Sequence, residues 1–338
     1  MLNEKCMQRN LLLLLPLYVL LGTPAIETMI PPNMQEQECD FDIVWGLSAR
    51  RGLRRTMEDT HVALSPYGND RAFFAIYDGH GGKQAAQMAA QLLHERLLQA
   101  LVENPETARQ AILEKAFEQT EECIIQEKST NSGTTAILAL LEKSNLHVAW
   151  VGDSRAIVIR GNEVKLATRD HKPDVPEEKE RIEKAGGTVG ICGVSRVFPS
   201  GLAVSRALGD HDIKCRDKGM IIATPEIMQL PLQNNDILIS ACDGLWDVIS
   251  NDGAMEIVHS LIKKDMTALK SEYPYTKLAF EFEEECGDES MRIIARVLRD
   301  TAVGRGSTDN ISVMAVQFKK RDTLKLAEAD LLKQCVLP

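Results

Sequence analysis

The sequence predicts an α+β protein, because stretches with helical periodicity precede and follow a cluster of short apolar runs typical of strands. The connections inside that cluster are short and hairpin-like, as at Lys143-Ser144-Asn145 and Gly161-Asn162. Parallel neighbours would need a much longer crossover between strands. The sequence therefore favours antiparallel sheets over a doubly wound parallel sheet.

The composition is that of an ordinary globular protein. The chain has 338 residues, of which 26% are charged and 44% hydrophobic, enough for one large domain or two smaller ones. The net charge of −10 argues against a nucleic-acid partner, which usually requires a basic face. The eight cysteines are scattered without a Cys-x-x-Cys pair, which favours reduced thiols over a disulfide framework or a zinc site. Reduced thiols in turn favour a cytoplasmic or nuclear protein.

Residues 1–38 are expected to form an N-terminal extension outside the core. Lys5 and Arg9 precede an apolar run at residues 11–21, which Pro16 interrupts. The run is shorter than the roughly 20 residues that a membrane-spanning helix requires. Three interpretations stay open, namely a membrane-associating segment, a cleaved targeting peptide and a disordered extension.

The domain itself is expected to begin with strands and to continue with helices. Apolar residues dominate at residues 41–48, 61–65 and 72–77, which predicts three strands. Residues 83–101 and 105–126 then carry apolar side chains at three- and four-residue spacing, which predicts two amphipathic helices.

Strands dominate the middle of the chain. They are predicted at residues 134–141, 146–151, 156–159 and 164–166, with short polar connections between them. A short charged helix is expected over residues 177–185.

The last part of the domain is expected to mix strands and helices. A strand is predicted at residues 236–242, helices at 254–264 and 289–303, and a final strand at 311–318.

An acidic insertion is predicted at about residues 265–288. Six of the nine residues from Glu281 to Glu289 are Asp or Glu. We favour a solvated surface loop here, with a docking or regulatory insertion as the alternative. The whole domain is thus expected to span residues 39–320, followed by a C-terminal helical tail at 321–338.

The strand predicted at residues 72–77 ends in Asp78-Gly79-His80-Gly81-Gly82. Glycine lets the backbone turn sharply and approach a ligand closely. A carboxylate and an exposed carbonyl are hard oxygen donors, which suit Mg²⁺, Mn²⁺ or Ca²⁺. A polar turn would explain one such motif without any ligand.

The same arrangement recurs along the chain, which a simple turn does not explain. Four further acidic loops lie at the ends of predicted strands: Met57-Glu58-Asp59, Gly152-Asp153-Ser154-Arg155, Asp243-Gly244-Leu245-Trp246-Asp247 and Thr308-Asp309-Asn310. Five acidic loops of this kind predict that carboxylates gather on one rim of a sheet scaffold.

Over residues 40–320 the chain resembles the metal-dependent Ser/Thr protein phosphatases of type 2C, the PPM family. The resemblance rests on Arg54 with the five acidic loops, and on three further motifs in family-like order and spacing: Ser132-Gly133-Thr134-Thr135-Ala136, Asp170-His171-Lys172-Pro173 and Ser205-Arg206-Ala207-Leu208-Gly209-Asp210. Each motif alone is weak, but the ordered set is specific.

The resemblance implies a four-layer α-β-β-α sandwich, with two central antiparallel sheets flanked by helices. It also implies two Mg²⁺ or Mn²⁺ ions, bridged by Asp78. The implied ligands are Asp59, Asp78, the Gly79 carbonyl, Asp243 and Asp309. A weaker third ion is implied at Asp153 and Asp247.

The resemblance further implies roles for side chains beside the metal ions. Arg54 has the position of the phosphate-binding arginine, since a guanidinium can hold two phosphate oxygens and stays charged, with Arg55 as the alternative. His80 has the position of the general acid that protonates the leaving alkoxide. Glu58 is expected to act through metal-bound water, and Asp210 to stabilise its loop without reacting.

The implied function is hydrolysis of phosphoserine and phosphothreonine in proteins by metal-activated water, without a phosphoenzyme intermediate. Phosphorylated proteins are the expected partners, and a monomer is the expected state. A catalytically inactive scaffold and a metal-dependent nuclease are the alternatives. No metal-binding aspartate is missing, which argues against the scaffold, and the negative net charge argues against the nuclease.

Overall fold

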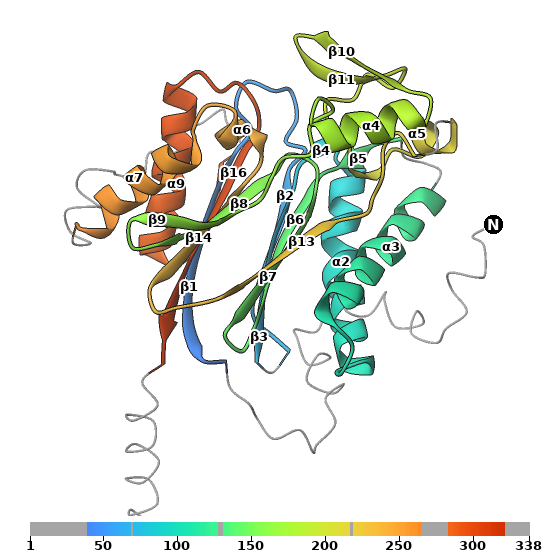
Figure 1. Cartoon of the computed structure of the whole chain (residues 1–338). Coiled ribbons are helices and arrows are strands. Elements are labelled where there is room, and N and C mark those ends of the chain that lie inside the picture. The colour runs from blue at the N-terminus through green and yellow to red at the C-terminus, as the bar shows by residue number, and fades with distance from the viewer. Residues whose placement is uncertain (1–38, 69, 128–130, 217–218, 265–282, 322–338) are drawn as a thin grey trace, which may run out of the picture.

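Figure 1 shows the computed structural model, which describes residues 39–68, 70–127, 131–216, 219–264 and 283–321. Within these ranges, no helix has both the length and the apolar character needed to cross a membrane. The predictions for residues 1–38, for positions 265–282 of the acidic insertion and for the tail beyond residue 321 lie outside the described residues.

Two antiparallel sheets form the centre of the fold. The six-stranded sheet has the order β15 (Glu283–Gly287), β1 (Phe41–Arg50), β16 (Ile311–Lys320), β14 (Asp236–Ala241), β8 (Arg155–Arg160) and β9 (Glu163–Ala167). The five-stranded sheet has the order β13 (Glu226–Pro231), β7 (Asn145–Val151), β6 (Ala136–Glu142), β3 (Arg71–Tyr77) and β2 (Thr60–Tyr67). Every strand pair in both sheets is antiparallel, as predicted.

Helices cover the outer face of each sheet (Figure 1). The helices α2 (Gln84–Glu103) and α3 (Arg109–Gln126) pack on the five-stranded sheet, and α7 (Asn251–Ile262) and α9 (Glu289–Gly304) pack on the six-stranded sheet. The implied α-β-β-α sandwich is therefore confirmed.

The central strands are apolar throughout because they are buried on both faces. In β3, Phe73, Ala75 and Tyr77 pack toward α2 and α3. The alternating residues Phe74 and Ile76 pack instead against the other sheet. This explains why the apolar runs of the sequence identified the central strands correctly.

The ends of the helices follow local chemistry. Helix α7 begins after Ser250, whose side chain accepts a hydrogen bond from the Gly253 amide at 3.1 Å. Helix α9 begins after Asp288, which accepts from the Ser290 amide at 2.9 Å. Helix α3 begins at Arg109, so the predicted start at residue 105 is four residues too early.

The prediction of a solvated acidic loop is wrong for residues 283–288. Residues Glu283–Gly287 form β15, which pairs with β1 at the sheet edge. The side chains of Glu283 and Glu285 are only 2% and 7% exposed, because Arg299 and Arg296 of α9 lie 3.9 and 3.6 Å from them. Cations from another element thus compensate the negative charge that indicated a solvated loop.

Three other strands of five or six residues also escaped the sequence analysis. Strand β13 pairs with β7 at an edge, and none of its residues is buried. Strands β10 (Thr188–Cys192) and β11 (Val194–Phe198) form a separate hairpin beside α4 (Pro176–Lys184), at the top of Figure 1. All three lack the apolar periodicity of a buried strand.

Glu178 connects α4 to the neighbouring segment at residues 205–206 through hydrogen bonds. Its carboxylate accepts hydrogen bonds from Arg206 at 2.6 Å, Arg181 at 2.8 Å and Ser205 at 2.5 Å, and the residue is 3% exposed. Burial raises the pKa of Glu178, but the hydrogen bonds from Arg206, Ser205 and Arg181 outweigh it and lower the pKa to about 2.

We expect Glu178→Gln to lower the free energy of unfolding at pH 7 by about 3 kcal/mol. The ionised carboxylate stabilises the folded state above the unfolded pKa of 4.5, and this contribution is lost as the pH falls toward about 2. The difference between wild type and variant in denaturant unfolding should therefore shrink below pH 4.5. The matched control is Glu180→Gln, whose exposed side chain pairs only with Lys184 among the described residues and whose unfolding should match wild type. An equal effect of both variants would contradict the role given to Glu178.

Candidate active site

The five acidic loops meet at one end of the sandwich, around a cavity of about 490 Å³. Seven of the side chains and one of the backbone positions predicted from the sequence line it: Arg54, Glu58, Asp78, Gly79, His80, Asp153, Asp243 and Asp309. Asp59 lies beneath the cavity, where its carboxylate is buried next to that of Asp78. Asp247 is not among the lining residues, and its side chain is 59% exposed.

Strand ends from both sheets place the central carboxylates. Asp78 directly follows β3, Asp153 follows β7, and Asp243 follows β14 as the first residue of the short helix α6 (Asp243–Trp246). Asp309 precedes β16, and Asp59 precedes β2. Because these strands stack in two layers, their ends converge on one rim, as the sequence predicted.

Two groups of potential ligand atoms lie within the rim. One oxygen from each of Asp78, Asp153 and Asp243 lies within 4.8 Å of the others. A second group with the same spacing combines Asp59, Asp78 and the Cys242 thiol. Asp78 belongs to both groups, which is the arrangement expected of a bridging ligand.

The electrostatics of the rim favour a bound cation. Burial, followed by the charges of Asp243 and Asp59, raises the pKa of Asp78 well above its usual value. Burial also raises the pKa of Asp59 to about 6, against a hydrogen bond from Ser312 that lowers it. Ionising these carboxylates together is unfavourable unless a cation compensates their charge.

Asp59 gives a more specific indication that the rim binds a cation. Its Oδ2 accepts a hydrogen bond from Ser312 at 2.7 Å, but its Oδ1 is buried and has no hydrogen-bond partner among the described residues. A buried, unpaired carboxylate oxygen is costly. Together with the other carboxylates, this oxygen fits a hard divalent cation such as Mg²⁺ or Mn²⁺.

His80 is held by a carboxylate from a distant part of the chain. A small three-stranded sheet places β4 (Gly79–His80) and β12 (Leu208–Gly209) on either side of β5 (Gly133–Thr134). The His80 Nε2 lies 3.0 Å from both carboxylate oxygens of Asp210, the residue after β12. Gly133 lies between them, and a Cβ atom there would come within 2.3 Å of His80 Nε2.

The Asp210 contact changes the proton affinity of His80. Burial lowers the pKa of His80, but the hydrogen bond and the charge of Asp210 outweigh this and raise the pKa above its usual value. The protonated imidazole is therefore favoured, as a general acid requires. The sequence analysis assigned Asp210 only a loop-stabilising role, because no local pattern connects it to His80.

Arg54 reaches into the cavity with a largely exposed side chain. Its Nη2 lies 2.5 Å from Asp309 Oδ2, and its side chain is 62% exposed. Arg55 also lines the cavity, so the geometry leaves both arginines beside the acidic rim. The sequence analysis missed a third arginine, Arg196 of β11, because it missed that hairpin.

Glu58 joins two of the loops at the rim. Its Oε2 accepts a hydrogen bond from the Gly82 amide at 3.0 Å, and its Oε1 accepts from the Thr56 hydroxyl at 2.7 Å. Its own amide donates to Asn310 Oδ1 at 2.8 Å. These bonds position the Arg54 loop against the loops of Asp78 and Asp309.

Asp153 and Asp247 both lie close to Lys172, to which the sequence analysis gave no role of its own. The Lys172 ammonium lies 2.5 Å from Asp153 Oδ2 and 4.0 Å from Asp247 Oδ1. Burial lowers the pKa of Lys172, but the charge and hydrogen bond of Asp153 outweigh it and raise the pKa. A cation at this position would compete with Lys172 for Asp153.

Comparison with known proteins places the chain in one group of enzymes. A family model for protein phosphatase 2C matches residues 43–311. Protein phosphatase 1B of Rattus norvegicus is 34% identical over 303 residues, which cover 81% of this chain and 70% of the relative. The probable protein phosphatase 2C 76 of Arabidopsis thaliana is 34% identical over 292 residues, which cover 84% of this chain and 61% of the relative.

A solved structure supports the fold independently. The structure of a C. elegans sex-determining protein superposes with a TM-score of 0.68 at 24% identity, over 88% of this chain and 70% of that chain. At this identity the likeness concerns the fold alone.

Proposed function

The chain belongs to the protein phosphatase 2C family of protein Ser/Thr phosphatases, and we propose that it hydrolyses phosphoserine and phosphothreonine in proteins by a metal-dependent reaction. The single observation that supports this most is the convergence of carboxylates from five loops, with Arg54 and His80, on one cavity.

We assign the metal ions to the acidic rim. The proposed ligands are Asp59, Asp78, the Gly79 carbonyl, Asp243 and Asp309, with a weaker third ion at Asp153 and Asp247. When bound, two Mg²⁺ or Mn²⁺ ions would supply a water nucleophile at neutral pH and neutralise charge, so that no phosphoenzyme is required. Lys172 gives a reason for a weaker third ion, since it already neutralises Asp153.

The residues of the chain would then bind and protonate the substrate. The Arg54 guanidinium holds two phosphate oxygens after the phosphate has displaced Asp309 from it. His80 donates its proton to the leaving serine or threonine oxygen, because an alkoxide is a poor leaving group at neutral pH. Asp210 contacts Nε2 of the imidazole and so orients the ring. The other ring nitrogen, Nδ1, makes no hydrogen bond with Asp210. Glu58 keeps the Arg54 loop in place and lines the cavity, where its carboxylate would face water bound to the metal ions.

Phosphorylated proteins are the proposed partners, and a monomer in the cytoplasm or nucleus is the proposed state. Association with a membrane through residues 11–21 is the alternative. These assignments rest on the family and on the sequence.

The proposal is tested with the full-length protein, Mn²⁺ and three substrates. We expect phosphate release from phosphothreonine and phosphoserine peptides and no cleavage of single-stranded DNA. A folded protein that binds Mn²⁺ but releases no phosphate would support the scaffold alternative, and DNA cleavage would support the nuclease.

We expect Asp210→Asn to lower kcat by about tenfold to a hundredfold and to leave KM nearly unchanged. Because Asp210 raises the pKa of His80, its loss lowers that pKa and moves the alkaline limb of the kcat profile to lower pH. The matched control is Asp212→Asn, two residues away with a 58% exposed side chain, which should leave the profile unchanged. An unshifted alkaline limb in Asp210→Asn would rule out its action through His80.

A further inference from the structure

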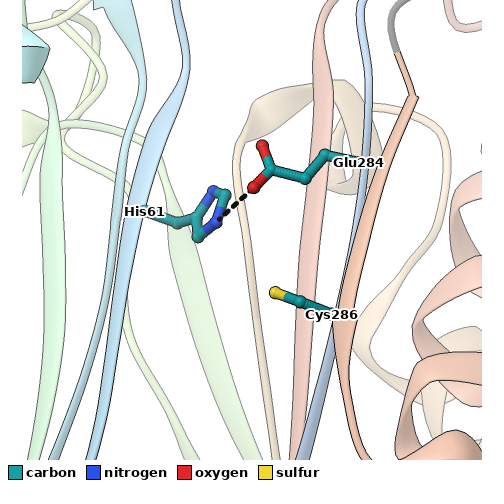
Figure 2. A group of neighbouring side chains, drawn as sticks. All are labelled: His61, Glu284 and Cys286. Carbon is teal, nitrogen blue, oxygen red and sulfur yellow. Dashed lines mark ion pairs between the residues drawn. The ribbon is translucent and has the colours of Figure 1, made fainter.

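Three side chains of different chemistry meet where the edges of the two sheets face each other. Figure 2 shows His61 on β2 pointing toward Glu284 and Cys286 on β15. The His61 Nε2 lies 3.5 Å from a Glu284 carboxylate oxygen. One ligand atom from each of the three residues lies within 4.8 Å of the other two.

The pairing of β15 fixes this arrangement. Successive side chains of a strand point to opposite faces, and Glu283 and Glu285 face the arginines of α9. Glu284 and Cys286 therefore face the other sheet. Cys286 packs against the apolar core between the sheets. The backbone register between β15 and β1 pairs Cys286 with Leu47 and Glu284 with Ala49, so both residues are anchored in the sheet.

The spacing of the three groups is close to that of a tetrahedral metal site. Bonds of about 2.0–2.3 Å at tetrahedral angles place neighbouring ligand atoms roughly 3.3–3.8 Å apart. The distance of 3.5 Å between His61 and Glu284 already lies in this range. The widest separation of 4.8 Å or less requires a movement of about 1 Å, within the reach of a side-chain adjustment.

The donor set selects the class of metal. An imidazole, a carboxylate and a thiolate suit borderline-soft cations such as Zn²⁺, whereas Mg²⁺ and Mn²⁺ prefer oxygen ligands only. Glu284 has a 45% exposed side chain, which gives an ion access from solvent, and His61 is 18% exposed. The only simpler account is an ion pair between His61 and Glu284, with Cys286 as a packing residue.

We propose that His61, Glu284 and Cys286 form a binding site for a zinc-class divalent cation, with water as the fourth ligand. The cation would clamp β2 of one sheet to β15 of the other. Binding would convert the Cys286 thiol to a thiolate and release its proton to solvent. The sequence analysis argued against a zinc site because it relied on closely spaced cysteines, whereas these ligands come from strands far apart in the chain.

Cobalt absorption tests this site in the full-length protein. Co²⁺ is added in the presence of excess Mg²⁺, which occupies the oxygen-rich rim, and the sulfur-to-cobalt charge-transfer band is recorded. We expect a band in wild type that Zn²⁺ displaces and that Cys286→Ser removes. We also expect His61→Gln to weaken Co²⁺ binding at least about tenfold. Far-ultraviolet circular dichroism verifies that each variant is folded.

Two cysteine controls separate this site from others. Cys242 lies beside Asp59 and Asp78 at the rim, and Cys215 is an exposed cysteine 3.5 Å from His211. The band should survive in Cys242→Ala and in Cys215→Ser. Absence of the band in wild type, its persistence in Cys286→Ser, or its loss in either control would overturn the proposal. If Cys286→Ser does not fold, Glu284→Gln replaces it and must weaken Co²⁺ binding at least about tenfold.

Discussion

Replacement of Asp78 by asparagine is expected to abolish the phosphatase activity and, in EDTA, to stabilise the protein. Asp78 belongs to both groups of potential ligand atoms, so its loss should disturb both proposed metal ions. We expect kcat/KM to fall at least about 10³-fold, which corresponds to about 4 kcal/mol of transition-state stabilisation.

The gain in stability follows from the charges around Asp78. Burial and the neighbouring Asp243 and Asp59 disfavour its ionised form, so its pKa is raised in the folded state. Below the pKa of 3.8 that Asp78 has in the unfolded chain, its carboxyl is protonated in both the folded and the unfolded state. As the pH rises from 3.8 toward the raised pKa of the folded state, the wild-type protein loses stability. Asparagine carries no charge, so the advantage of Asp78→Asn in EDTA should be absent near pH 4 and grow as the pH rises.

Urea unfolding in EDTA at several pH values measures this advantage, and phosphopeptide assays with Mn²⁺ measure the activity. The matched control is Asp252→Asn, an exposed position in the first turn of α7. That variant should keep wild-type activity. An active Asp78→Asn, or one that is less stable than wild type in EDTA at neutral pH, would contradict the assignment of Asp78.

Replacement of His80 by glutamine is expected to slow hydrolysis by a factor that depends on the leaving group of the substrate. Hydrolysis of a phosphothreonine peptide should slow by about 10²–10⁴-fold, because the departing alkoxide then receives no proton. An aryl phosphate releases a stable phenolate, which needs no proton, so its hydrolysis should slow by less than about tenfold.

The comparison of the two substrates separates general-acid catalysis from a loss of structure. Misfolding or loss of metal would slow both reactions equally. The control is His259→Gln, a partly exposed histidine in the last turn of α7. It should keep wild-type rates with both substrates. Equal losses with both substrates in His80→Gln would show that His80 does not act as the general acid.

The sequence predicted the parts of the fold that are buried on both faces. The apolar run of β3 follows directly from its place between α2 and the second sheet. Strand β15 could not be found in this way, because two of its three glutamates, Glu283 and Glu285, form ion pairs with arginines of α9. Edge strand β13 and the β10–β11 hairpin contain only one buried residue, Val197, and lack a periodic apolar pattern.

The candidate site likewise has parts that the sequence predicts and parts that only the folded structure shows. Its carboxylates lie beside strand ends, so local motifs were enough to predict that Asp78, Asp243 and Asp309 gather on one rim. The contacts that tune the site join distant parts of the chain, as the His80–Asp210 pair does, and only the folded structure brings them together.

The most direct test of the central claim is phosphate release from a phosphothreonine peptide in EDTA, Mg²⁺ and Mn²⁺, by wild type and Asp243→Asn. Calorimetric titration with Mn²⁺ accompanies each assay, so that binding and activity are measured on the same protein. Our account predicts that wild type is inactive in EDTA and active with either metal, and that Asp243→Asn loses both the activity and at least one Mn²⁺-binding event. Undiminished activity of wild type in EDTA, or of Asp243→Asn with Mn²⁺, would contradict it.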